Sequence, residues 1–138
     1  MFSSLLPSLT QLSRKMGVWR WLPFVSVAAT IFFASSQSSD DLPSFGVVDH
    51  LVKKGSHFLG YMLLALAYQF ANSNSRSFWQ VVLVCLVYAV TDEAHQIFSE
   101  GRYPSWVDVL IFDHAGIWTG VYLWKKVVTQ TQGQILHR

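Results

Sequence analysis

The chain has 138 residues, which suffice for one domain but not for two. Apolar residues make up 51% of it and charged residues only 13%, about half the charged share of an average soluble domain. Together with six Trp, five Tyr and ten Phe, this balance predicts an integral membrane protein with aromatic side chains at the interfaces. The net charge of +2, without a Lys- or Arg-rich run, argues against nucleic-acid binding. Cys85 is the single cysteine, so an internal disulfide and a Cys-based metal site are excluded.

The chain opens on a polar, serine-rich lead over residues 1–17. The first hydrophobic segment, Val18–Ser35, has about 18 residues and just crosses a hydrocarbon core of about 30 Å. A cleaved secretory signal peptide is the alternative, because Arg14 and Lys15 precede the segment and small residues end it. Three further hydrophobic segments follow, and they favour a permanent anchor.

Those three segments are separated by polar loops and cover Ser56–Ala71, Phe78–Phe98 and Trp106–Trp124. Because Ser56–Ala71 is short for a span, it needs either an extension by Leu51–Gly55 or a locally thin membrane. We expect loops over Ser36–Leu51, residues 72–76 and Ser99–Ser105, where Pro, Gly, Asn and Ser gather. The predicted fold is therefore an all-α, integral membrane four-helix bundle. Its organisation is a cytoplasmic lead over 1–17, the membrane domain over 18–125 and a polar, frayed cytoplasmic tail over 126–138.

Charge predicts the orientation of this bundle. With a cytoplasmic N-terminus, seven Lys and Arg residues fall on the cytoplasmic side, against Lys53, Lys54 and Arg102 on the other. This satisfies the positive-inside rule with both termini in the cytoplasm. All eight acidic residues lie between Asp40 and Asp113, in or beside the two predicted outer loops. We therefore expect the functional groups at the outer membrane face.

The second segment carries a polar and aromatic stripe. Lys54, His57 and Tyr61 recur at steps of three or four and share one helix face. The alternative is an ordinary helix end, with a snorkelling lysine and an interfacial His and Tyr.

The third segment turns abruptly polar at Asp92 and Glu93. A carboxylate in or at the edge of the hydrocarbon is costly, and such groups usually face the bundle interior and serve function. The alternative is a helix end with its acids in water, but acids are disfavoured at the negative pole of the helix dipole. Glu93 and Gln96 share one face, and Asp92 and His95 a neighbouring one.

The last loop and the fourth segment supply Arg102, Ser105, Asp108 and Asp113. Ser105 fits a helix N-cap, and Asp108 falls in the first turn, where an acid suits the positive pole. Asp113 lies deeper and needs a partner, for which Lys54, Arg102, His57 and a bound cation are the candidates. Arg102 and Lys54 together could clamp a phosphate or a carboxylate.

Three other patterns carry no catalytic prediction. Gly116 and Gly120 form a small-xxx-small face that allows another helix to approach closely. The His, Asp and Glu residues are metal ligands by type, but no pair has the spacing of a metallopeptidase helix, and we predict no metal. No serine lies in a nucleophile elbow.

In this order, the residues resemble the VanZ-like family of small bacterial membrane proteins. The match comprises Ser35-Ser36-Gln37, Lys54-x-x-His57-Phe58-x-x-Tyr61, Asp92-Glu93-x-x-Gln96-x-Phe98, Gly101-Arg102, Ser105-x-x-Asp108-Val109 and Gly116-x-x-x-Gly120. It spans about residues 35–120. One departure is Asp113, where the family pattern leads us to expect an asparagine.

The resemblance implies a role in the bacterial cell envelope, because the family is named for a teicoplanin-resistance accessory protein. It implies one site made of His57, Glu93, Gln96, Arg102 and Asp108, to which the helix stripe adds Lys54 and Tyr61. We expect an anionic envelope lipid or a lipid-linked cell-wall precursor as ligand, with His57 and Glu93 as the acid–base pair if the protein is an enzyme.

Two alternatives stay open. One is a non-enzymatic structural or partner-binding bundle that the buried ions lock together. The other is a small proton-coupled carrier using Glu93 and Asp113, although the chain has no inverted repeat. The sequence identifies no cofactor and no oligomeric state.

Overall fold

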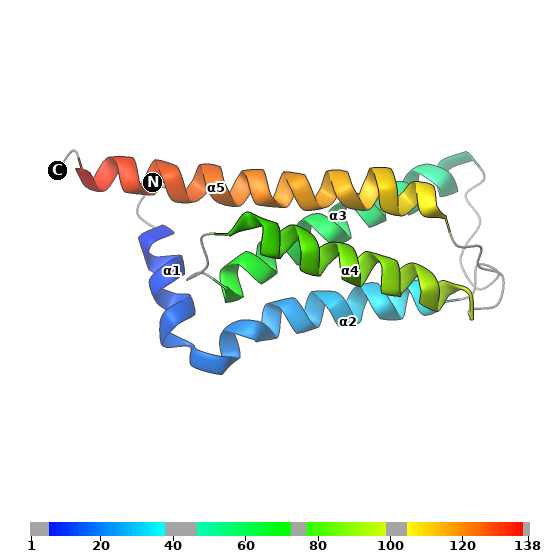
Figure 1. The fold of residues 1–138 in the computed structure, drawn as a ribbon, viewed down its shortest axis with the longest axis horizontal. Coiled ribbons are helices and arrows are strands. Elements are labelled where there is room, and N and C mark those ends of the chain that lie inside the picture. Colours follow the sequence, from blue (N-terminus) through cyan, green and yellow to red (C-terminus); the bar gives the residue numbers. More distant parts are fainter. Residues whose placement is uncertain (1–5, 38–46, 73–76, 99–104, 137–138) are drawn as a thin grey trace.

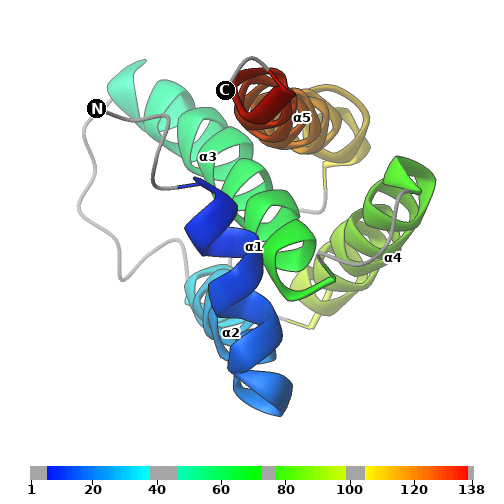
Figure 2. The ribbon, with the colours of Figure 1, turned by 90° about the vertical axis from the view of Figure 1, so that its left-hand side faces the viewer.

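The computed structural model describes residues 6–37, 47–72, 77–98 and 105–136, and all regular structure within these ranges is helical. In chain order the elements are α1 (Leu6–Lys15), the 3₁₀ helix η2 (Gly17–Trp21), α2 (Leu22–Ser36), α3 (Val47–Ala71), α4 (Phe78–Gln96), the π-helical η4 (Asp108–Asp113) and α5 (His114–Leu136). Figure 1 shows α2, α3, α4 and α5 running the length of the molecule. Seen from the end, they surround a common centre, with α1 lying across them (Figure 2). The all-α prediction is confirmed.

Two predicted element boundaries are wrong. The loop expected to reach Leu51 ends earlier, because α3 begins at Val47. The following residues contain no Pro, and apolar positions recur at helical spacing, so the helix extends into the expected loop. The tail expected to be frayed from residue 126 is helical to Leu136. Gln, Lys and Leu are good helix formers and no Pro interrupts them, which continues α5.

The lead forms α1, which packs on the bundle at the end where the termini lie (Figure 1). Ser13 is fully buried, and its hydroxyl donates to the carbonyl oxygen of Phe70 on α3 at 2.5 Å. Arg14 and Lys15 are exposed. The chain leaves α1 through Gly17, whose φ of +57° lies in the left-handed region that glycine adopts without strain. This turn sends the chain into η2 and α2.

The closest helix contact joins α3 to α5 and depends on two glycines. A Cβ atom at Gly116 would overlap the carbonyl oxygen of Phe58 and lie 3.1 Å from the backbone nitrogen of Met62. One at Gly120 would lie 2.7 Å from the carbonyl oxygen of Met62. Gln69 adds a polar link, because its Nε2 donates to the carbonyl oxygen of Gly120 at 3.3 Å. The predicted packing role of the glycine pair is confirmed.

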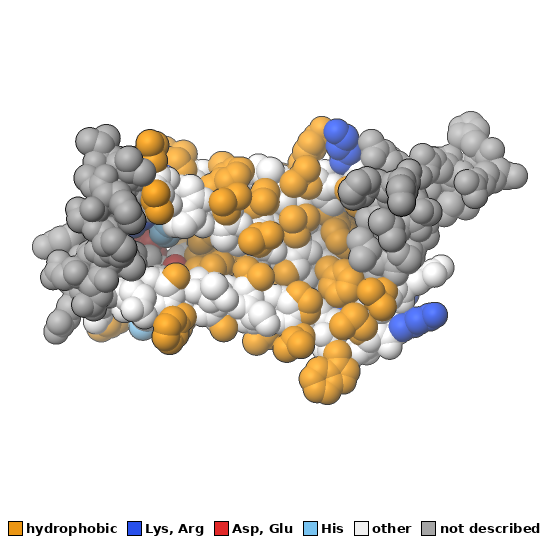
Figure 3. Space-filling view, turned by 180° about the vertical axis from the view of Figure 1, so that it is seen from behind, with side chains coloured by type: hydrophobic (Ala, Val, Ile, Leu, Met, Phe, Trp, Pro, Cys, Tyr) orange, Lys and Arg blue, Asp and Glu red, His pale blue; other side chains and the backbone are white. Residues whose placement is uncertain are grey.

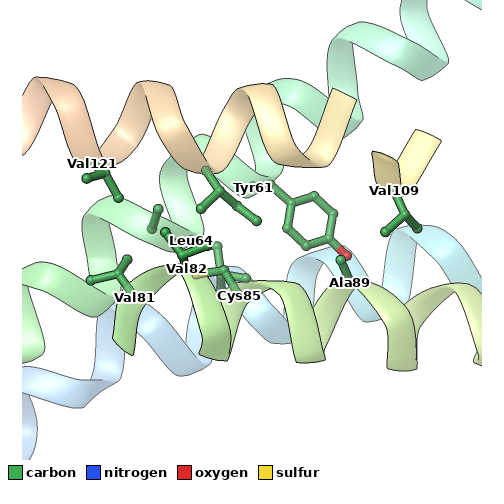
Figure 4. Packing of buried hydrophobic residues seen from close by; sticks show 10 residues of the cluster. Tyr61, Leu64, Val81, Val82, Cys85, Ala89, Val109 and Val121 are labelled. Atoms are coloured by element: carbon green, nitrogen blue, oxygen red, sulfur yellow. The ribbon is translucent and has the colours of Figure 1, made fainter. Parts of the chain in front are cut away.

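Small side chains fill much of the centre, and large ones cover the outside. Leu64, Ala65 and Cys85 are fully buried in the core cluster drawn in Figure 4. By contrast, Phe33 and Trp79 are more than 60% exposed. Figure 3 shows hydrophobic side chains distributed along the middle of the face that it draws. One described helical stretch, Gly17–Ser36, is long and apolar enough by length and composition to cross a membrane.

Candidate functional site

Buried polar side chains gather at the end of the bundle opposite α1, where α2 and α4 end and α3 and η4 begin (Figure 1). We call them the polar cluster, and its members are His57, Asp92, Glu93, Gln96, Asp108 and Asp113. The four acids and the glutamine are each at most 4% exposed. Burial of so many ionisable groups is costly unless each has partners, so the contacts of each define what the site can do.

The central contact of the polar cluster joins α3 to η4. Nδ1 of His57 lies 2.9 Å from Oδ1 of Asp113, whose side chain is 1% exposed. A carboxylate that accepts from Nδ1–H fixes the tautomer and the orientation of the ring, which leaves Nε2 to accept or deliver a proton. Among the described residues, Nε2 of His57 has no hydrogen-bond partner. The pair therefore has the arrangement of a general acid–base group.

The π-helical geometry of η4 brings two acids into the same site. Asp108 and Asp113 are five residues apart, and in an α-helix such residues point about 140° away from each other. The hydrogen bonding of a π-helix joins residues five apart and stacks them on one side. The backbone N–H of His114 accordingly donates to the carbonyl oxygen of Val109. Asp108 and Asp113 are consequently both buried.

On α4, Glu93 and Gln96 contact each other, as their shared face predicts. Nε2 of Gln96 lies 3.4 Å from Oε2 of Glu93, and Oε1 of Glu93 accepts from the backbone N–H of Ser105. The hydroxyl of Ser105 lies 3.4 Å from the backbone nitrogen of Asp108, consistent with the predicted cap. Glu93 thereby holds the start of the last helix against the end of α4.

The end of α2 supplies two serines. The hydroxyl of Ser35 donates to Oδ1 of Asp92 at 2.5 Å. Ser36 lies beside it, and its Oγ is 3.0 Å from Nε2 of His95. The imidazole of His95 stacks on Phe32 with ring centroids 4.3 Å apart. These contacts fasten α2 to α4 on one side of the polar cluster.

Two lysines of α3 border the polar cluster. Nζ of Lys53 lies 3.8 Å from Oδ2 of Asp108, and the Lys53 side chain is 37% exposed. Nζ of Lys54 lies 5.2 Å from the centre of the Phe112 ring, in a cation–π contact. We call Lys53 and Lys54 the lysine pair. Lys53 makes the ion pair with Asp108, whereas the predicted site residue is its neighbour Lys54.

The members of the polar cluster act on one another electrostatically. His57 interacts with Asp113, Asp108 and Glu93, and Asp92 interacts with both His57 and His95. Four carboxyl groups thus lie within electrostatic range of one imidazole, and Asp113 contacts it directly. The interior of the site is acidic, and its basic groups among the described residues lie at the border.

Two polar atoms of the site have no partner among the described residues. They are the hydroxyl of Tyr61 and Oε1 of Gln96, and both side chains are 1% exposed. The Tyr61 ring lies beside that of His57, with centroids 6.4 Å apart and planes inclined by 22°. No group of three or more His, Cys, Asp or Glu side chains in the described part of the chain is arranged to hold a metal ion.

The family model described as VanZ/LLP1 matches residues 1–129. The chain belongs to the VanZ/LLP1 family. No curated protein and no solved structure matches it. The family match confirms the resemblance drawn from the sequence, and it extends beyond the matched motifs on both sides. It leaves the chemistry of this VanZ/LLP1 site to be argued from its geometry.

The structure brings most of the predicted site residues of this VanZ/LLP1 protein together. His57, Tyr61, Glu93, Gln96 and Asp108 all lie in or against the polar cluster. Their roles in binding or catalysis stay a prediction. Arg102, and with it the predicted clamp of Arg102 and Lys54, lies outside the described residues.

Sequence reasoning left three members of this VanZ/LLP1 site without a role. Asp113 needed a partner, and the structure gives it His57, one of the four candidates. Asp92 was noted as an intramembrane acid but not as a site residue, although Ser35 binds it. The residue pattern favours Lys54 over Lys53, and only the geometry distinguishes these two adjacent lysines.

Proposed function

We propose that this VanZ/LLP1 protein is a multi-pass integral membrane protein of the bacterial plasma membrane. Large apolar side chains are exposed on all four long helices, beyond what a soluble monomer tolerates. The 19 residues of α4 extend about 28 Å, which matches a hydrocarbon core of about 30 Å. The polar cluster lowers the hydropathy of α3, α4 and the last helix at one end only. Among the described residues, Gly17–Ser36 is accordingly the one helical stretch apolar enough along its whole length to cross a membrane.

The proposed orientation places both termini in the cytoplasm and the polar cluster at the outer face. The exposed basic residues Arg14, Lys15, Lys125 and Lys126 lie on the helices at the end opposite the polar cluster. In Figure 3 Lys and Arg side chains stand out at one end, and the visible Asp, Glu and His side chains lie at the other. That asymmetry is the positive-inside pattern.

At the outer face, we propose that the site binds or acts on an anionic envelope lipid or a lipid-linked cell-wall precursor. The lysine pair borders the polar cluster and supplies the positive charge that attracts a phosphate, and Arg102 is a further candidate from the sequence. The observation that carries the proposal is the buried His57–Asp113 pair within an acidic cluster at a bundle end. If the protein is an enzyme, His57 exchanges the proton through Nε2, with Glu93 as the second acid–base group.

The test is mass spectrometry of polyprenyl phosphates and lipid-linked precursors incubated with proteoliposomes. Wild type is compared with Glu93→Gln and His57→Gln, and the thermal stability of each variant in detergent checks that it is folded. A lipid that binds or changes with the wild type and not with the folded variants supports the proposal. Wild type that neither binds nor alters any anionic lipid would refute it.

A second candidate is a bundle whose polar contacts serve only its architecture. The specific observation is that several contacts of the polar cluster join two helices. Ser35–Asp92 links α2 to α4, and His57–Asp113 and Lys53–Asp108 link α3 to η4. Under this candidate, Glu93→Gln and His57→Gln lower thermal stability and alter no interaction with lipid.

A link to glycopeptide resistance is a separate proposal, supported by family membership alone. Expression in a teicoplanin-susceptible bacterium tests it. Raised teicoplanin tolerance that His57→Gln abolishes would support a role of this site, and unchanged susceptibility with wild type would count against it.

A further inference from the structure

The two unpartnered atoms of the site require an explanation. The hydroxyl of Tyr61 and Oε1 of Gln96 are buried, and neither has a hydrogen-bond partner among the described residues. Leaving one such atom unsatisfied costs about 1–3 kcal/mol. Native proteins rarely accept that cost except where a ligand, an ion or water completes the contact. Two such atoms in one cluster therefore indicate a missing partner.

Both side chains lie close to acids of the polar cluster. Figure 4 shows the ring of Tyr61 extending from α3 with its hydroxyl beside Ala89 of α4. Ala89 and Gln96 are seven residues, or about two turns, apart and lie on one side of α4, as does Glu93 between them. Tyr61 also interacts electrostatically with Asp92, Asp113 and Glu93. Both unpartnered atoms therefore belong to side chains that lie among the acids of the polar cluster.

The chemistry of the two atoms restricts the missing partner. The Tyr61 hydroxyl needs an acceptor for its proton, whereas Oε1 of Gln96 needs a donor. A phosphate only accepts, and the four carboxyl groups would repel its charge. An ammonium group only donates, so the proton of Tyr61 would stay unpaired. A hydroxyl group both donates and accepts, so a portion with several hydroxyls offers each atom the partner it lacks without adding charge.

We propose that the buried part of this site takes an uncharged, hydroxyl-bearing portion of a lipid head group, such as a glycerol or a sugar. This deepens the proposed function and rests on it, because the phosphate of the same lipid stays at the lysine pair. The carboxylates accept the remaining hydroxyl protons. One ligand hydroxyl beside His57 would then be the group from which Nε2 takes a proton.

The test compares lipids that differ only in the hydroxyl-bearing group. Full-length protein in nanodiscs is titrated with phosphatidic acid against phosphatidylglycerol, and with polyprenyl phosphate against polyprenyl phosphoglucose. Wild type is expected to bind the hydroxyl-bearing member of at least one pair more tightly. Tyr61→Phe should weaken the binding of that hydroxyl-bearing lipid about 3- to 10-fold, the range that one hydrogen bond accounts for. The affinity for the lipid of the pair without the hydroxyl-bearing group should stay unchanged. Gln96→Met should act in the same direction.

Tyr88→Phe is the matched control. The hydroxyl of Tyr88 donates to the carbonyl oxygen of Ala28 at 2.5 Å, so its removal affects a helix contact and should leave lipid preference unchanged. Tyr61→Phe removes only an unpartnered oxygen, so it should fold even if Gln96→Met does not.

Three results would overturn the inference. Equal binding within both pairs would do so while leaving an anionic-lipid function standing. A preference that survives in Tyr61→Phe would show that the tyrosine hydroxyl binds water or nothing. Tighter binding of phosphatidylethanolamine than of phosphatidylglycerol would indicate an ammonium group instead. Absence of binding to every phosphate lipid would refute the proposed function itself.

Discussion

The imidazole of His57 and the carboxylate of Asp113 meet at 2.9 Å although 56 positions separate them in the chain. The contact crosses from α3 to η4, and Asp113 is almost completely buried in it. An acid in that position depends on its partner, because a buried carboxylate with no partner loses its hydration without compensation. The stability of this end of the bundle should therefore respond very differently to changes of the two residues.

Replacing His57 by Ala should destabilise the protein by about 3 kcal/mol or more, because it leaves Asp113 buried and alone. Asp113→Asn should cost no more than about 1 kcal/mol, since the amide oxygen still accepts from Nδ1–H of His57. Asparagine is also the residue that the family pattern leads us to expect here. Thermal unfolding in detergent measures both. Equal losses from the two variants would contradict a buried pair.

Gly116→Ala should loosen the contact of α3 with α5. The added Cβ would overlap the carbonyl oxygen of Phe58, so a backbone must move, at a cost of about 1–3 kcal/mol. Gly55→Ala is the matched control, because a Cβ there meets nothing within 4 Å in the same pair of helices. It should stabilise α3 by about 0.5–1 kcal/mol. A comparable loss of thermal stability in both variants would refute the close-packing argument.

Tyr61→Phe and Tyr88→Phe should have opposite effects on the protein without ligand. Tyr61→Phe removes a buried hydroxyl that lacks a partner, so the free energy of unfolding should stay level or rise. Tyr88→Phe removes the hydrogen bond to Ala28 and should lower it by about 1 kcal/mol. Chemical denaturation in detergent compares the two. A destabilised Tyr61→Phe would mean that its hydroxyl has a structural partner.

Topology can be tested with the single cysteine. In a Cys85→Ala background, cysteines are introduced at Phe98 near the polar cluster and at Gln11 on α1, both exposed in the structure. A membrane-impermeant maleimide added to intact cells, or to spheroplasts if an outer membrane is present, should label Phe98→Cys and spare Gln11→Cys. Lysis should make Gln11→Cys reactive. Labelling of Gln11→Cys before lysis would reverse the proposed orientation.

The central parts of the long helices are predictable from the sequence, because long uninterrupted apolar runs favour helices. The start of α4 at Phe78 agrees with the predicted segment, and α4 ends two residues before the predicted limit at Phe98. The end of α3 at Ala71 also agrees with the prediction, whereas its start and the end of α5 do not. Polar residues such as Lys125 and Gln130 suit a helix as well as a tail. Polarity alone does not mark where such a helix stops.

The site was partly predictable for a similar reason. Acids after an apolar run, as at Asp92 and Glu93, indicate inward-facing groups wherever the helices pack. The partner of Asp113 could not be chosen from the sequence, because His57, Lys54 and Arg102 all precede the last helix at unknown distance. The inward position of both Asp108 and Asp113 depends on the π-helical winding of the backbone, which no residue pattern in this segment predicts.

The π-helical winding of η4 separates the acids of the last helix from the glycines that pack against α3. The π-helical turn contains one residue more than an α-helical turn. It therefore rotates Asp108 about the helix axis relative to the glycine pair, Gly116 and Gly120, that packs against α3. Removing one residue from this turn, such as the exposed Ile111, would restore α-helical phase and rotate Asp108 by about 100° about the helix axis. Gly116 and Gly120 would still pack against α3. The direction in which Asp108 points and the packing of α5 against α3 can therefore change independently.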